Sequence, residues 1–276
     1  MTVLSNAVTR PEHPGRESNA RPQVEPNEFL TAVFHTLPNK AQPMLLSVAQ
    51  DAPQSAWEGW ALNPRGVLQL DPQENCYFSI ASIRPTGSRY RRRLENAEAV
   101  HAIVLDDIGS KVDADRIPLE PSWIVETSPD NCQYGYILRD PIATQEAKRL
   151  LNALAASGWT DAGAKSAVHW MRLPFGQNCK PPVIEEWGEP FPVALHHWSP
   201  ERLYSPHELA QGFRLDLPPD QMENTPQGAT KADQMDVCGT HEALCEAAKN
   251  IVTDAARRTH DDPTLGRHSE IVRMAH

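Results

Sequence analysis

The segment His101-Ala-Ile-Val-Leu-Asp-Asp107 is an apolar run that stops abruptly at two adjacent carboxylates. A run of this length, rich in branched residues and ended by acidic ones, predicts a buried central strand. At the tip of such a strand, Asp106 and Asp107 could offer the oxygen ligands that Mg²⁺ and Mn²⁺ prefer. Successive strand residues face opposite sides, so the two side chains share one site only if the backbone turns, which Gly109 would permit. The alternative is a solvated strand end followed by an ordinary acidic turn.

Outward from this strand, apolar periodicity and turn residues predict the other helices and strands. The expected elements are a helix over 26–34, short strands over 44–48, 55–61 and 76–81, a connector over 96–100, a hairpin over 122–138 that turns at 128–131, a helix over 144–157 and a strand over 168–173. Pro174 is expected to break the last strand. Residues 181–206 are rich in Pro and Trp and are expected to be irregular.

The chain has 276 residues, which is enough for one large domain and a smaller appendage. Residues 1–25 have little apolar content and predict a disordered tail, which precedes a main domain over 26–216. Residues 217–235 have the composition of a linker. Residues 236–276 predict a helical C-terminal domain, with its clearest helix over 240–259. Because the chain stops inside an apolar pattern, we expect either a fragment of a longer protein or a small helical domain that ends here.

Composition excludes several classes of protein. No window approaches the roughly 18 consecutive apolar residues of a membrane span, and the N-terminus lacks the apolar core of a secretory signal. The five cysteines form no CxxC pair, which favours reduced thiols in a cytoplasmic protein without a membrane partner. A net charge of −10 argues against coating nucleic acid by bulk attraction. It leaves room for an enzyme that grips nucleic acid locally and brings its own cations.

Two later segments carry residue types that suit phosphate. In Glu126-Thr-Ser-Pro-Asp-Asn-Cys-Gln133, small polar residues could present hydroxyls, amides and backbone N–H groups. Met171-Arg-Leu-Pro-Phe-Gly-Gln-Asn-Cys-Lys180 follows Asp161 and carries two cations and an amide, namely Arg172, Lys180 and Asn178. Taken singly, each segment could equally be an ordinary turn or surface charge.

The order of these segments resembles the RepB-like primases of plasmids and phages, which belong to the archaeo-eukaryotic primase (prim-pol) superfamily. The resemblance covers roughly residues 75–182. RLPFGQNCKP is similar to the family signature RLPG-x-x-N-x-K, and ETSPDNCQ is similar to its hairpin ETSPGN-x-Q. The two aspartates are adjacent, as in the RepB-like branch. Phe175 adds a bulky residue to the third motif.

The resemblance implies an α+β fold: a primase-polymerase catalytic core whose central mixed or antiparallel sheet is flanked by helices, followed by a small helical C-terminal region. It implies a DNA primase of phage or plasmid replication, which joins nucleoside triphosphates on a single-stranded DNA template by two-metal transfer. The residues implied as ligands of Mg²⁺ or Mn²⁺ are Asp106, Asp107 and Asp161. Those implied in nucleotide binding are Ser128, Gln133, Arg172, Asn178 and Lys180. Gln133 stands where many superfamily members carry a histidine, so it cannot supply a charge there.

A run dense in arginine precedes the acidic strand. Arg89, Tyr90, Arg91, Arg92 and Arg93 combine positive charge with an aromatic ring. This pattern is typical of contacts to single-stranded nucleic acid or to phosphate. The alternative is a solvated basic loop.

Two functions of other kinds remain open. A replication-initiation or nucleic-acid-binding module without catalysis would suit the acidic composition, and a metal-dependent nuclease also uses paired aspartates. The RLP…N-x-K segment favours a triphosphate substrate over a nuclease. No GxxxxGK[ST] motif is present, so a partner helicase would act in trans or lie in a longer chain. His169, His196 and His197 are interpreted as surface or packing residues.

Overall fold

The computed structural model describes residues 21–217, apart from 39, 50–51, 53–56, 58, 63–67, 69 and 164. Nearly all of the expected tail over 1–25 therefore lies outside the described residues. Of the expected linker over 217–235, only residue 217 is described. The expected helical region over 236–276 lies entirely outside the described residues. Within the described ranges, no helix has the length and apolar character needed to cross a membrane.

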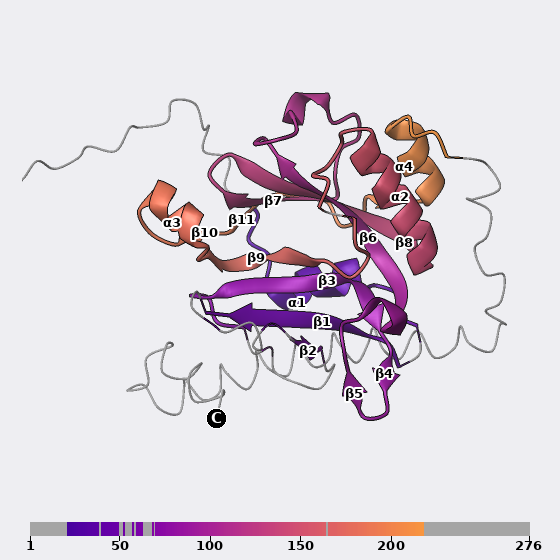
Figure 1. Cartoon of the computed structure of the whole chain (residues 1–276), viewed down its shortest axis with the longest axis horizontal. Coiled ribbons are helices and arrows are strands. Elements are labelled where there is room, and N and C mark those ends of the chain that lie inside the picture. The colour runs from indigo at the N-terminus through magenta and orange to yellow at the C-terminus, as the bar shows by residue number, and fades with distance from the viewer. Residues whose placement is uncertain are drawn as a thin grey trace, which may run out of the picture.

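A ten-stranded sheet forms the centre of the molecule (Figure 1). Its strands are β1 (Gln42–Val48), β2 (Trp60–Ala61), β3 (Asn75–Ile83), β6 (Ala97–Ile108), β7 (Trp123–Ser128), β8 (Asn131–Ile142), β9 (Trp170–Asn178), β10 (Phe191–Pro192), β11 (Ala194–Trp198) and β12 (Leu203–Tyr204). All pairings are antiparallel except that of β12 with β8. The expected mixed sheet of an α+β fold is confirmed. A separate hairpin, β4 (Pro85–Thr86) and β5 (Arg89–Tyr90), projects from it.

The sheet divides along β3, which has two different partners on one of its sides. Ala81–Ile83 pairs with the start of β6, and Asn75–Ser79 pairs with β9. β6 leaves β3 after Val100 and continues alongside β8. The result is one branch of β1, β3, β9 and β10 and another of β6, β8, β7 and β11, one above the other in Figure 1.

Helices cover both faces of the sheet. On one face, Phe29 of α1 (Pro26–Val33) packs edge-on against Trp123, with ring centroids 5.2 Å apart. Trp123 lies across Gly135, because a Cβ there would be 1.9 Å from its ring. The next residue, Tyr136, therefore faces the other side, where it packs against Phe213 beside α4 (Pro206–Gly212) at 5.5 Å.

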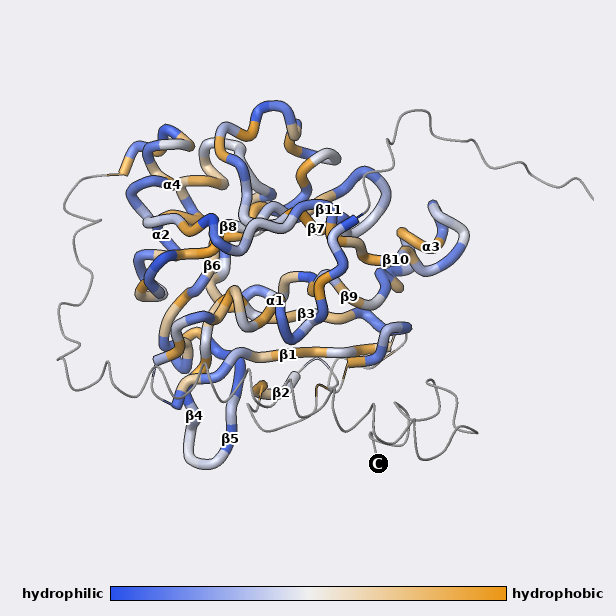
Figure 2. The backbone as a smooth tube through the Cα atoms, turned by 180° about the vertical axis from the view of Figure 1, so that it is seen from behind, coloured by the Kyte–Doolittle hydropathy of each residue, from blue (hydrophilic) through white to orange (hydrophobic). Residues whose placement is uncertain are grey.

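The helix α2 (Thr144–Ala156) lies beside α4 (Figure 1), and its buried face is formed mainly by Ala and Leu at helical spacing. Figure 2 shows apolar residues concentrated along strands such as β1, while hydrophilic residues predominate in the connections. The core therefore has two apolar layers, one on each face of the sheet.

Three sequence-based expectations about local structure are wrong. Residues 97–100 are not a connector, because β6 begins at Ala97. Pro174 does not break β9, which continues to Asn178, because it lies opposite an irregularity in the pairing with β3, a place where proline is tolerated in a sheet. Residues 181–206 are not irregular: they contain β10, β11, β12 and the helix α3 (Pro181–Trp187), whose prolines occupy its first positions, where proline is tolerated.

Candidate functional site

The two aspartates lie on β6 at a bulge. Two residues of β6, Asp106 and Asp107, stand opposite the single residue Gln133 of β8. Asp107 has φ of 61°, in the left-handed region, so the backbone turns there. The expected turn is thus at Asp107 itself, although Gly109 follows with φ of 98°.

The bulge brings both carboxylates to one side of the sheet. Gln133 Nε2 donates to Asp106 Oδ1 over 3.1 Å, and Asn131 Nδ2 donates to Asp107 Oδ1 over 3.1 Å. Asn131 and Gln133 are two apart on β8 and face the same way. The expectation that Asp106 and Asp107 could share one site therefore agrees with the geometry.

Asp161 joins this pair through a lysine that the sequence analysis missed. Lys111 Nζ lies 2.7 Å from Asp107 Oδ2 and 2.7 Å from Asp161 Oδ1. The Asp161 N–H donates to the Asp106 carbonyl over 3.3 Å, and Thr160 Oγ1 accepts from the Asp106 N–H over 2.9 Å. The loop after α2 is thereby fixed to β6, and the three acids form one carboxylate cluster.

The electrostatics of the cluster favour a cation. Burial, and then the charge of Asp107, raise the pKa of Asp106, while the hydrogen bond from Gln133 opposes the rise. The ammonium of Lys111 lowers the pKa of Asp161. Burial lowers the pKa of His169, and the negative charge of Asp106 partly opposes this change. An added positive charge would stabilise the ionised form of the buried Asp106.

A polar network joins the two branches of the sheet beside the cluster. Gln133 Oε1 accepts from the Arg172 N–H over 3.0 Å, so one amide connects β6, β8 and β9. Asn178 Nδ2 donates to the Thr127 carbonyl over 2.6 Å, which connects β9 to β7. Gln133 and Asn178 thus occupy positions that hold β9 against the hairpin of β7 and β8.

Arg172 is buried within this network. Its side chain donates to Asn178 Oδ1 over 2.6 Å and to the Gln177 carbonyl over 2.9 Å, and its guanidinium lies 4.3 Å from the centroid of the Tyr77 ring. Only 3% of Arg172 is exposed. Arg172 therefore has a structural role in addition to any contact with a ligand.

Lys180 lies just beyond the end of β9. Desolvation and the charge of Arg172 lower the pKa of its ammonium, whereas Asp106 and Asp107 act in the opposite direction. The charges of Arg172 and of the two carboxylates therefore both act on the Lys180 ammonium. The Lys180 backbone N–H donates to Asn178 Oδ1 over 3.3 Å.

Ser128 is less closely tied to the site. It pairs with Asn131 at the turn of the hairpin. Among the described residues, no hydrogen bond connects its side chain to the carboxylate cluster. Asn131 contacts Asp107 instead, and its spacing of two from Gln133 was the signal that could have found it.

The residues Arg89–Arg93 lie on β5 and the segment after it, and among the described residues no hydrogen bond or ion pair joins them to the three acids. Tyr90 donates its hydroxyl to the Lys40 carbonyl over 2.9 Å. Arg92 lies over Trp170 at 4.3 Å and donates to the Val168 carbonyl. Arg92 therefore lies against the start of β9, which leads to Arg172.

The chemistry of the acids suits a hard divalent cation, although the cluster is not preformed. Among the residues with a described position, no three His, Cys, Asp or Glu side chains are already arranged around a metal position. The donors are all carboxylate oxygens, which Mg²⁺ and Mn²⁺ prefer. Lys111 marks a place where two of them already bind a positive charge. The residues fit such an ion if Lys111 moves aside.

A family model matches a large part of the chain. Residues 46–219 match the family model of the RepB DNA-primase N-terminal domain. No curated protein matches the chain. Three solved structures are similar, at the level of fold. The first is the AEP domain of the cyanophage S-2L primase-polymerase (TM-score 0.47, 16% identity, 67% of this chain and 95% of that one).

The second is primase RepB′ (TM-score 0.46, 17% identity, 81% of this chain and 65% of that one). The third is the catalytic domain of primase RepB′ in complex with initiator DNA (TM-score 0.44, 21% identity, 67% and 93%). The family match spans well over half of the chain and confirms the resemblance drawn from its motifs. The chain therefore belongs to the RepB DNA-primase family, whose N-terminal-domain model matches residues 46–219.

Proposed function

We propose that the chain synthesises primers on single-stranded DNA by two-metal nucleotidyl transfer, in phage or plasmid replication in the bacterial cytoplasm. The observation that carries the proposal is the meeting of Asp106, Asp107 and Asp161 in one cluster, directly beside the network of Arg172 and Asn178. The acids of the cluster, together with Arg172 on β9 and Lys180 just beyond its end, would act on one reacting phosphate.

Asp106, Asp107 and Asp161 would hold the Mg²⁺ or Mn²⁺ ions, with Lys111 displaced from between two of them. When bound, such ions neutralise the triphosphate and lower the pKa of the attacking hydroxyl. Gln133 keeps Asp106 oriented through its 3.1 Å hydrogen bond. Asn131 does the same for Asp107.

The incoming nucleotide would be held on the β9 side of the cluster. Lys180 supplies a flexible point charge for the triphosphate, and Arg172 adds a fixed positive charge. Asn178 orients both residues, because its Oδ1 accepts from the Arg172 guanidinium and from the Lys180 N–H. We assign Ser128, at the hairpin turn, and Gln133 to the same nucleotide site.

The arginine run would bind the template. Arg89, Arg91 and Arg93 carry charge on exposed chain, and Tyr90 adds a ring beside them. The net charge of −10 does not oppose this, because binding depends on local positive charge. A replicative helicase, in trans or in a longer chain, would be the partner that exposes single-stranded template.

Primer synthesis on single-stranded DNA tests the proposal directly. The rate of primer synthesis is measured for the wild type and for Asp106→Asn. Each protein is assayed on NTPs and on dNTPs, in the presence of Mg²⁺, of Mn²⁺ or of a chelator. The exposed Asp140 lies toward the other end of β8, so Asp140→Asn is the matched control. We expect metal-dependent products from the wild type and the control and none from Asp106→Asn. Shortened template without new product would identify a nuclease, and binding without either reaction would identify a non-catalytic module.

A further inference from the structure

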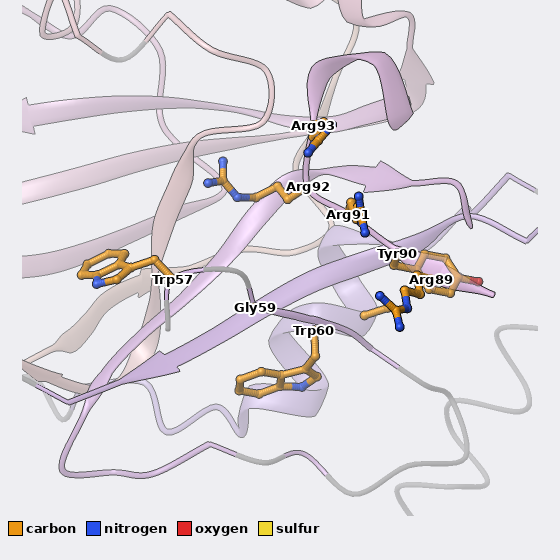
Figure 3. Close-up of a pocket in the computed structure, with 9 residues that line it drawn as sticks. Trp57, Gly59, Trp60, Arg89, Tyr90, Arg91, Arg92 and Arg93 are labelled. Atoms are coloured by element: carbon orange, nitrogen blue, oxygen red, sulfur yellow. The ribbon is translucent and has the colours of Figure 1, made fainter. Parts of the chain in front are cut away.

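A pocket of about 660 Å³ lies between the arginine run and the segment that leads into β2 (Figure 3). Among the described residues, most of its lining consists of aromatic and basic side chains. The residues are Trp57, Gly59, Trp60, Ala61 and Arg89–Arg93. None of them belongs to the carboxylate cluster. The pocket therefore has no place in the transfer step itself.

Trp57 offers an open ring to this pocket. It is 36% exposed, which is unusual for a large apolar side chain in this structure. One side is supported by Tyr77, with ring centroids 5.6 Å apart. Exposing a supported aromatic ring costs hydrophobic free energy unless a ligand covers the ring.

The cations beside it are available for a ligand. Within the described part of the chain, Arg89 and Arg91 have no carboxylate partner, and Arg92 Nε is buried without a hydrogen-bond acceptor. In Figure 3 the Arg92 guanidinium extends toward the side on which Trp57 lies, whereas Arg89 and Tyr90 lie on the other side. Positive charge thus follows the pocket from one end to the other.

The start of β9 connects this pocket to the carboxylate cluster. Arg92 stacks on Trp170 at 4.3 Å, and Gly59 approaches the same ring so closely that a Cβ would lie 2.7 Å from Trp170 Cη2. Arg172 follows two residues later on the same strand, and the Arg172 N–H is bound by Gln133. A ligand in the pocket would therefore be held beside the strand that carries the nucleotide-binding cations.

We propose that this pocket binds a nucleotide unit of single-stranded nucleic acid, with the base stacked on Trp57 and the flanking phosphates on Arg89, Arg91 and Arg92. Stacking on an aromatic ring requires an unpaired base, which excludes a duplex. Successive arginines suit phosphates repeated along a strand better than one free nucleotide. This inference rests on the proposed function and deepens it, since it adds Trp57 to the template contacts.

Binding is measured with the full chain and a fluorescently labelled oligonucleotide, without divalent metal or nucleoside triphosphate, so that catalysis plays no part. We expect Trp57→Ala to weaken binding about 5- to 150-fold, the range of one lost base stack, and Trp57→Phe to restore most of it. Arg91→Ala should reduce the slope of log affinity against log salt by about 0.7. Lys148→Ala, the same charge change on the exposed side of α2, should leave binding unchanged.

Three outcomes would overturn the inference: wild-type affinity in Trp57→Ala, equal competition by duplex DNA, or displacement of the strand by free nucleotide at its own binding concentration. Oligodeoxythymidine and oligouridine arms distinguish DNA from RNA as the strand. Asp106→Asn should bind the oligonucleotide as the wild type does. If that variant binds normally while the wild type makes no primer, the proposed function fails and the pocket assignment stands. Unchanged melting temperatures would show that the Trp57 and Arg91 variants are folded.

Discussion

Replacing Asp107 by Asn and by Ala separates the chemistry of this carboxylate from the conformation of its backbone. Asp107 has φ of 61°, a region that Asn and Asp adopt readily and Ala does not. Asp107→Asn keeps the conformation and an oxygen that can accept from Asn131, but it removes the charge. Asp107→Ala removes the charge, the acceptor and the conformational preference.

The expected difference in stability follows from the backbone. A left-handed conformation costs a residue such as Ala roughly 1–2 kcal/mol. In a domain of this size, each kcal/mol lowers the melting temperature by about 2–4 °C. Asp107→Ala should therefore melt about 2–8 °C below Asp107→Asn. Calorimetry of the two variants measures this difference.

Both variants should lose primer synthesis. A metal ligand is lost in each, so the rate should fall by more than the roughly 10- to 100-fold cost of altering a group behind the ligands. In Asp107→Asn the pKa of Asp106 should also fall, because the charge of Asp107 is one of the two causes that raise it. Carboxylate titration by NMR measures this fall.

Two results would refute the reasoning. A wild-type rate in Asp107→Asn at saturating Mg²⁺ or Mn²⁺ would remove Asp107 from the metal site. Equal melting temperatures for the Asn and Ala variants would show that the left-handed turn carries no strain.

Four further changes test other parts of the molecule. Lys111→Met should lower the Mg²⁺ concentration for half-maximal primer synthesis, because the competing ammonium is gone; a higher requirement would show that Lys111 assists the metal. Arg172→Ala should weaken nucleotide binding in calorimetric titrations and also destabilise the fold, by about 1.5–3 kcal/mol for each charged hydrogen bond lost; wild-type affinity would exclude a nucleotide contact. Gly135→Ala should cost about 1–3 kcal/mol by forcing Trp123 aside, and an unchanged melting temperature would mean that the ring moves freely. Burial and, less strongly, a neighbouring histidine lower the pKa of His101 to about 3, so the free energy of unfolding should fall by about 1.4 kcal/mol per pH unit as the pH drops from about 6.5 toward that value. His101→Gln should reduce this pH dependence, measured by urea unfolding at pH 5 and 7. The same pH dependence in both proteins would contradict the assignment.

Local patterns were sufficient for the elements around the acids. Residue types over short windows predict the apolar run into Asp106, the hairpin that contains Gln133 and the helix that begins at Thr144. The order of the motifs then brought Arg172 and Asn178 into the same site. Arg172 and Asn178 could be assigned only through the resemblance, because taken singly their segment could be ordinary surface charge and turn.

The features that the sequence did not predict depend on contacts between segments that are distant in the chain. Lys111 meets Asp161 only because the loop after α2 returns to β6. The left-handed turn at Asp107 results from a register shift against β8, which no local pattern reveals. The segment over 181–206 was misjudged because its prolines disfavour interior structure, whereas they occupy a helix start and an edge strand.

The division of β3 between two partners also has a consequence for biosynthesis. On the ribosome, β6, β7 and β8 emerge early and can pair with one another as near neighbours. β9 must then cross back to Asn75–Ser79, a contact of long sequence separation that forms slowly. Until β9 pairs with β3, Gln133 beside Asp106 lacks its hydrogen bond from the Arg172 N–H, and Arg172 and Lys180 are not yet positioned. We therefore expect nucleotide binding by the nascent chain to report the docking of β9.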